Sequence, residues 1–261
     1  MGTSTPWEGP GGERWNTASR RLSRWRPDTK NADERLEGIA GDFLSALHET
    51  LRTDRSAFGL YEAACSAGGR LVDALGSLAQ EGPESTEVLP ARLAREVGGD
   101  GGTLVDATMR RAAAQAGRDI LDRRSEIAES FASGPVSGWA WDLLCDLYQA
   151  FFARVAAEFL RSVIAEHVKL AIPVLVAADP EARIVDWIGD RLLELVPSPC
   201  EEAHRATGPT EVQDNVESVP DVSGNPDDAL VETALHLVPK AVGRVLGLIA
   251  GGITAEREDA A

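Results

Sequence analysis

The chain has 261 residues, 43% of them hydrophobic, and a formal net charge of −16 at pH 7. This length can bury a sizeable core without a disulfide or metal, so it excludes little by itself. The acidic charge argues against a general nucleic-acid coat, because binding phosphates needs positively charged faces. Aromatic residues are sparse, whereas Ala, Leu, Arg and Glu are abundant, which predicts an all-α protein with almost no strand.

Cysteine usage and hydropathy indicate the compartment. The three scattered cysteines form no CxxC pair, which predicts ordinary thiols in a reducing environment rather than a disulfide framework or a zinc site. No signal-peptide pattern is present at the start, and no run of about eighteen uncharged apolar residues occurs. We therefore expect a soluble, cytoplasmic protein with no membrane partner.

Residues 1–32 have the composition of a flexible N-terminal arm. Glycine and proline recur in this segment, and both oppose regular structure. The segment nevertheless contains Trp7, Trp15 and Trp25, and disordered linkers seldom contain three tryptophans. A short helix from Asn16 to Trp25 would place Leu22 and Trp25 on one face.

Residues 33–197 carry the pattern of an irregular helical bundle. The longest apolar series, which ends at Pro173, predicts the central core helix. Thr103 and Asp106 have a near capping-box spacing that predicts a helix start, and Gly68-Gly69 predicts a kink or a close helix crossing. The spacing of apolar residues and the helix breakers predict helices near 33–52, 56–80, 86–97, 103–131, 137–173 and 181–196.

The remainder divides into a linker and a last helix. Residues 198–227 are acidic, contain few large apolar groups and predict a disordered linker. Residues 228–254 predict a C-terminal amphipathic helix that packs back on the bundle or docks to a partner. A membrane-surface role is disfavoured because this helix lacks a broad basic face.

No catalytic or metal-binding pattern emerges. The four histidines lie far apart, and no activated Ser or Cys motif is present. The run Gly98–Thr103 resembles a phosphate cradle, yet it lacks the Lys and the preceding strand of a Walker loop, so we favour a loop with a helix cap. Asp142 and Asp146, one turn apart, fit a solvated face better than an acid-base pair or cation site. We predict no catalytic residue, metal or cofactor, and no enzyme activity.

The segment Arg14–Lys30 is the one basic island of the chain. Arginines beside tryptophans could bind single-stranded nucleic acid. They could equally dock on the protein's own acidic bundle or on a partner, where Trp and Arg are favoured anchors. The net charge favours protein docking, and any nucleic-acid contact is confined to this arm. The predicted partner-binding residues are Thr3, Ser4, Thr5, Trp7, Trp15, Arg20, Arg21, Arg24 and Trp25.

Gly2 is the predicted modification site. Its small size favours removal of Met1, which leaves an unhindered glycine amine that can enter the narrow site of another enzyme. The myristoylation pattern does not fit, because it requires Ser or Thr where Pro6 stands.

Three stretches together resemble the QatB-like component of the Qat anti-phage defence system. The first is Met1-Gly2-Thr3-Ser4 followed by Gly9-Pro10-Gly11-Gly12, similar to that family's Gly-Thr-Ser arm. The second runs from Gly101-Gly102-Thr103 to Asp106 and Arg110-Arg111, similar to its Gly-Gly-Thr-Ile-Asp segment. The third is the apolar helix from Trp141 to Pro173, followed by Asp186-Trp187-Ile188.

The resemblance implies three partners, namely an ATPase, a QueC-like enzyme and a TatD-like nuclease. It also implies that Gly2 is acylated by the QueC-like enzyme with a 7-deazaguanine group. We therefore expect a non-catalytic scaffold subunit of a bacterial defence complex. The alternatives are a nucleic-acid-sensing adaptor that uses the Arg/Trp-rich segment 14–30, and an unrecognised enzyme.

Overall fold

The computed structural model describes residues 10–81, 88–99, 101–123, 141–171, 179–207 and 226–249. These residues contain helices and no strand, which confirms the predicted all-α fold, and none of their helices has the length and hydropathy to cross a membrane. In chain order the elements are α1 (Glu13–Arg24), α2 (Ala32–Thr53), a 3₁₀ turn η1 (Ala57–Gly59), α3 (Leu60–Glu81), α4 (Leu89–Val97), α5 (Leu104–Arg123), α7 (Trp141–Ala171), α8 (Pro180–Leu193), α9 (Pro199–Thr207) and α10 (Pro226–Val245).

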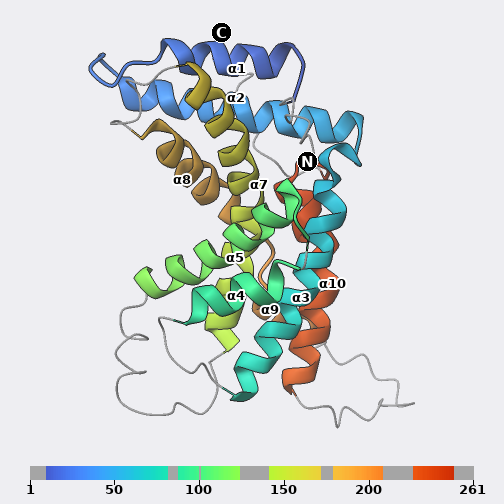
Figure 1. The fold of residues 1–261 in the computed structure, drawn as a ribbon. Helices are drawn as coiled ribbons and strands as arrows, with labels where there is room; N and C mark the ends of the chain where they lie inside the picture. The colour runs from blue at the N-terminus through green and yellow to red at the C-terminus, as the bar shows by residue number, and fades with distance from the viewer. Residues whose placement is uncertain are drawn as a thin grey trace, which may run out of the picture.

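Helix α7 is the axis of the bundle. Every residue from Ala150 to Leu160 is buried, so this part of the helix is covered on all sides. Helices α5 and α8 pack closely against it, and α3 and α10 cover a further side (Figure 1). The predicted central core helix is therefore confirmed.

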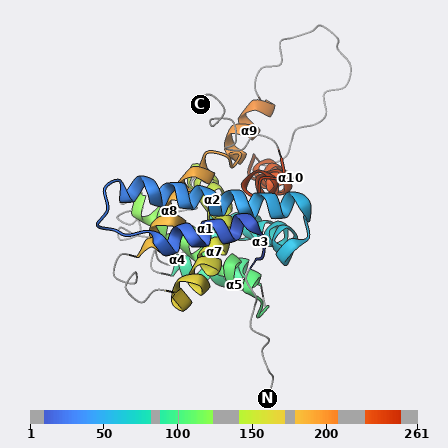
Figure 2. The same cartoon turned by 90° about the horizontal axis from the view of Figure 1, so that it is seen from above.

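Helices α1 and α2 lie side by side across one end of the bundle (Figures 1 and 2). Helix α2 also packs on α8, while α10 packs along α3. Figure 2 shows the short helix α9 at the edge of the molecule, next to α10.

Gly68 permits a close crossing of three helices. A Cβ atom on Gly68 would lie 2.7 Å from Cζ of Phe152 on α7 and 2.7 Å from Cγ1 of Val238 on α10. A Cβ atom on the neighbouring Gly69 would meet nothing within 4 Å. Since α3 continues through both residues, the pair marks a crossing rather than a break.

Helix α5 begins with the predicted cap. The Thr103 hydroxyl and backbone N–H both donate to Oδ2 of Asp106, over 2.6 Å and 3.1 Å, and the Asp106 backbone N–H donates to Oγ1 of Thr103 over 3.1 Å. The two bonds that the Asp106 carboxylate accepts from Thr103 hold its pKa below the ordinary value. The capping box is confirmed, with Asp in the position usually held by Glu.

Three predicted boundaries require correction. The arm predicted over 1–32 contains the helix α1 (Glu13–Arg24), three residues longer at its start than the short helix predicted from Asn16, and three apolar side chains of α1 are buried against the bundle. The linker predicted over 198–227 contains α9, and residues 208–225 lie outside the described residues. The last helix, predicted over 228–254, ends at Val245, and residues 246–249 form a turn. Residues 124–140, between α5 and α7, and 250–254 also lie outside the described residues.

Candidate functional site

The inner face of α1 is part of the core. Trp15 and Leu22 are 3% and 2% exposed, and Trp25, just beyond the helix, is 3% exposed. The indole N–H of Trp15 donates to Oγ1 of Thr50 over 3.0 Å, and that of Trp25 donates to the Ala32 carbonyl over 2.8 Å. Both tryptophans thus have their polar atom satisfied inside the protein.

This burial corrects the prediction that Trp15 and Trp25 bind a partner. Their apolar rings pack on the helical body and are inaccessible to another molecule. For these two residues, the alternative prediction that the arm docks on the protein's own bundle is confirmed. The burial also removes Trp15 and Trp25 as platforms on which nucleic-acid bases could stack. The remaining predicted residues of the arm, Gly2, Thr3, Ser4, Thr5 and Trp7, lie outside the described residues.

The outer face of α1 is strongly basic. Arg21 pairs with Asp42 on α2, and Arg14 pairs with Glu49. We define the basic face as the exposed cations around the end of α1 and the start of α2, none of which forms an ion pair with any part of the chain that the structure describes. They are Arg20, Arg24, Arg26, Lys30 and Arg35.

A hollow of about 790 Å³ lies beside the start of α1. Gly11 and Gly12 line it on one side, and Asp42, Glu49 and Asp54 line it on the other. The chain that follows the first nine residues enters the folded body here. Glu49 and Asp42 are paired with Arg14 and Arg21, so the hollow carries charges of both signs, in contrast to the basic face on the outside of the same helix.

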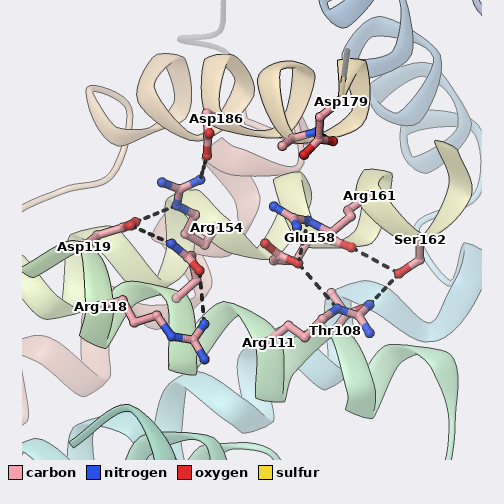
Figure 3. Close-up of polar contacts among 12 residues, drawn as sticks. Thr108, Arg111, Arg118, Asp119, Arg154, Glu158, Arg161, Ser162, Asp179 and Asp186 are labelled. Atoms are coloured by element: carbon pink, nitrogen blue, oxygen red, sulfur yellow. Dashed lines mark hydrogen bonds and ion pairs between the residues drawn. The ribbon is translucent and has the colours of Figure 1, made fainter. Parts of the chain in front are cut away.

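A buried charge network joins α5, α7 and α8 (Figure 3). Arg154 donates from Nε to Oδ2 of Asp119 over 2.7 Å and from Nη1 to Oδ1 of Asp186 over 2.9 Å. The Arg154 and Asp119 side chains are only 9% and 10% exposed. Burial lowers the pKa of Arg154, but the two carboxylates outweigh this effect and raise it.

A second cluster lies along α7 from the first. Glu158, with a side chain 3% exposed, faces Nε of Arg111 at 3.4 Å and Nε of Arg161 at 3.3 Å, and Arg111 also donates to the Ser162 hydroxyl (Figure 3). These carboxylates are already engaged by guanidinium groups, so the two clusters fasten three helices. Two charged residues four positions apart within an otherwise apolar helix, Arg154 and Glu158, could have indicated these clusters from the sequence. The sequence analysis did not predict them.

The glycine loop before α5 does not act as a phosphate cradle. Arg70 donates to the Val97 carbonyl over 2.9 Å and 2.7 Å, and Arg110 donates to the Gly99 and Gly101 carbonyls over 3.2 Å and 2.9 Å. A cradle must present amide N–H groups to an anion. This loop instead directs carbonyl oxygens at two cations, and the favoured interpretation of a capped loop is confirmed.

No metal centre is formed within the described ranges, where no three His, Cys, Asp or Glu residues are suitably grouped. His48 is buried, with Nε2 3.0 Å from the Val245 carbonyl. Burial is the main cause that lowers the His48 pKa. The imidazole fastens the chain after α10 to α2, together with Arg52, which donates to the Gly247 carbonyl over 2.7 Å.

The cysteine prediction is wrong for two of the three residues. Cys145 on α7 and Cys200 on α9 form a disulfide, with Cα atoms 6.1 Å apart. The residues are separated by 55 positions, and spacing in a single sequence does not reveal such a pair. Cys65 is a free thiol whose pKa is raised, chiefly by burial.

The chain was compared with known protein families, curated proteins and solved structures. No known protein family, curated protein or solved structure shows a significant match to the chain.

Proposed function

We propose that this chain is a non-catalytic subunit of a bacterial anti-phage defence complex, similar to the QatB-like component of the Qat system. It presents Gly2 as a substrate to a QueC-like enzyme and scaffolds the ATPase and the TatD-like nuclease. Catalysis belongs to these partners.

The observation that carries the proposal is the anchoring of α1. Trp15 and Trp25 fix this helix on the bundle, and it begins directly after Gly11-Gly12. Gly2 lies eight residues before Pro10, so its amine is tethered within roughly 28 Å of the folded body. A short tether on a rigid anchor suits a segment that is delivered into the site of another enzyme.

The basic face supports the scaffold role. Its five exposed cations stand on a chain with a net charge of −16 and lie on the helix that follows the tethered segment and in the chain just after that helix. Complementary charge at an interface raises the association rate and selects partners. An acidic protein surface fits this face better than a nucleic acid, because Trp15 and Trp25 are buried.

Two of the three stretches that carry the resemblance have structural roles. Asp106 caps α5, and a side chain on Gly101 would collide with it. Asp186 pairs with Arg154, and Ile188 is buried. These two stretches therefore support a likeness to the QatB-like component in the helical body only. The proposed function depends on the first stretch, which contains Gly2.

Intact-mass spectrometry tests the modification. The full chain is produced together with its genomic neighbours, and we expect a mass that corresponds to loss of Met1 and gain of one 7-deazaguanine acyl group. Gly2→Leu should abolish the added mass, because a bulky second residue retains Met1 and removes the glycine amine. Gly9→Leu makes the same substitution in the same segment and should keep the adduct.

An unmodified glycine terminus in the presence of an active QueC-like enzyme would overturn the modification. An adduct that survives Gly2→Leu would place the chemistry elsewhere in the chain.

Charge reversal tests the docking role. Arg20→Glu with Arg24→Glu should weaken recovery of the partner proteins at least about tenfold. Arg95→Glu with Arg118→Glu changes the net charge equally on other exposed helical positions and should leave recovery unchanged. Arg20→Glu with Arg24→Glu could instead abolish salt-dependent binding of single-stranded DNA and leave recovery of the partner proteins intact. That result would favour the nucleic-acid-sensing adaptor over the scaffold subunit.

A further inference from the structure

Helix α9 has little apolar attachment to the bundle. Among its residues 199–205, Pro199 alone is buried. Arg205 pairs with Glu201 and Glu202 of the same helix, which adds no link to another element. Lys240 of α10 reaches Glu202 only at 3.7 Å, between side chains that are 42% and 35% exposed. Exposed pairs of this kind contribute little stability.

A helix of this length needs an external attachment. It has nine residues, and isolated helices shorter than about 12–15 residues are marginal in water. The strongest link between α9 and the bundle is the Cys145–Cys200 disulfide, at the first turn of the helix. Cys145 is buried, at 5% exposure, whereas Cys200 is partly exposed.

The chain before α9 is held separately. The Val196 carbonyl accepts a hydrogen bond from Nε2 of Gln149 over 3.0 Å, and the Leu195 carbonyl accepts one from Arg244 over 3.3 Å. Val196 itself is 4% exposed. Loss of the disulfide would therefore free the chain from Pro197 onward and leave residues 195–196 in place.

We propose that the Cys145–Cys200 disulfide is a redox latch that controls the docking of α9. In the oxidised protein α9 is fastened to α7 and lies against α10. In the reduced protein α9 detaches while the rest of the bundle stays folded. Disulfides that operate in reducing compartments are typically transient and redox-sensing.

A cellular dithiol is the reductant class that the latch requires. Its thiolate attacks Sγ of Cys200, the more exposed residue of the two, so that the Cys145–Cys200 bond breaks and Cys145 leaves as a thiolate that takes up a proton. The second thiol of the reductant then attacks the mixed disulfide and releases Cys200. Two electrons and two protons are transferred to the protein, and the reductant becomes a disulfide.

Detachment changes the surface of α10. A hollow of about 500 Å³ lies between the two helices, with Glu202 on one side and His236, Leu237 and Lys240 on the other. Leu237 is 3% exposed in the latched form. Release of α9 removes the Glu202 side of this hollow and opens the α10 side, which includes Leu237, to solvent or to a partner.

Hydrogen–deuterium exchange of the full-length oxidised and reduced protein tests the latch. Amides of α9 should exchange at least about 30-fold faster after reduction with dithiothreitol, which corresponds to the lower range of typical disulfide stabilisation. Amides of α5 and α8 should be unchanged. Cys200→Ser should give the fast α9 exchange without any reductant, and Cys65→Ser, which leaves the bridge intact, should behave as the wild type.

Three results would overturn the proposal. The first is equal α9 protection in both states. The second is faster exchange in all helices together, because the bond would then stabilise the whole fold. The third is a disulfide that dithiothreitol does not reduce in the native protein.

Discussion

Helices α1 and α9 are both short and peripheral, yet they are attached in different ways. Helix α1 has twelve residues and buries Trp15, Ala18 and Leu22 against the bundle. Helix α9 has nine residues, buries Pro199 among its described side chains, and is joined to α7 by a disulfide. Apolar burial persists as long as the protein is folded, whereas a disulfide depends on the redox environment.

The difference assigns distinct roles to the two attachments. The helix that carries the tethered Gly2 segment is held under all conditions in which the bundle is folded. In the proposed latch, the helix that covers part of α10 is held only while the disulfide is intact. One attachment is therefore permanent in the folded protein, and the other depends on a bond that can be reduced.

Truncation of a core tryptophan should produce the largest loss. Trp15→Ala removes a buried ring and leaves the Thr50 hydroxyl without its donor, so we expect the free energy of unfolding to fall by about 3–5 kcal/mol. Urea denaturation measures this loss. Arg24→Ala on the exposed side of the same helix should change it by less than about 0.5 kcal/mol. Equal effects of the two variants would show that α1 is not held by its inner face.

Loss of a buried charge in the body should come next. Arg154→Met leaves Asp119 buried without its cation, and we expect a loss of about 3 kcal/mol. The double variant Arg154→Met with Asp119→Leu should recover most of this loss, as a double-mutant cycle would show. Exchange at α1 should be unaffected, since Arg154 donates to carboxylates on α5 and α8 and not to α1. A double variant as unstable as the single one would contradict the argument.

Substitutions of the adjacent glycines Gly68 and Gly69 test how closely α3 packs on α10. Gly68→Ala places a methyl group against Phe152 and Val238 and should cost about 1–3 kcal/mol. Gly69→Ala meets open space in the same helix and should stabilise the protein by about 0.5–1 kcal/mol. Thermal denaturation should thus shift in opposite directions. Shifts in the same direction would mean that the crossing is looser than described.

Acidification should weaken a third attachment, that of the turn after α10. Burial holds the His48 pKa below its ordinary value of 6.5, so at lower pH the unfolded chain takes up a proton that the folded chain does not. The stabilisation is complete above pH 6.5 and is lost as the pH falls towards the lowered pKa. His48→Gln should flatten this dependence in urea titrations, and His236→Gln, at an exposed position, should retain it.

Much of the fold could be predicted because apolar periodicity reports which face of a helix is buried. Apolar periodicity predicted the core helix α7, and the spacing of the polar residues Thr103 and Asp106 predicted the cap of α5. Helix α1 carried a comparable signal in Leu22 and Trp25, but the surrounding glycines and prolines favoured an arm. Helix α9 gave no such signal, because its side chains form no apolar stripe.

The candidate site was less predictable because it depends on tertiary pairing. Composition identified the basic island, but only the fold separates Trp15, which is buried, from Arg20, which is exposed. Three cysteines allow three pairings or none, and the choice of Cys145 and Cys200 depends on the distance between two helices. Spacing along a chain does not contain that distance.

The packing of α10 along α3 also determines when the protein can finish folding. His48 on α2 contacts the Val245 carbonyl 197 residues further along the chain, and Val238 fills the space beside Gly68. During synthesis, therefore, the side of α3 that packs on α10 has no cover until the chain beyond residue 226 has left the ribosome. Until then it is a surface for aggregation or chaperone binding, and a nascent chain halted before this point could not close its core.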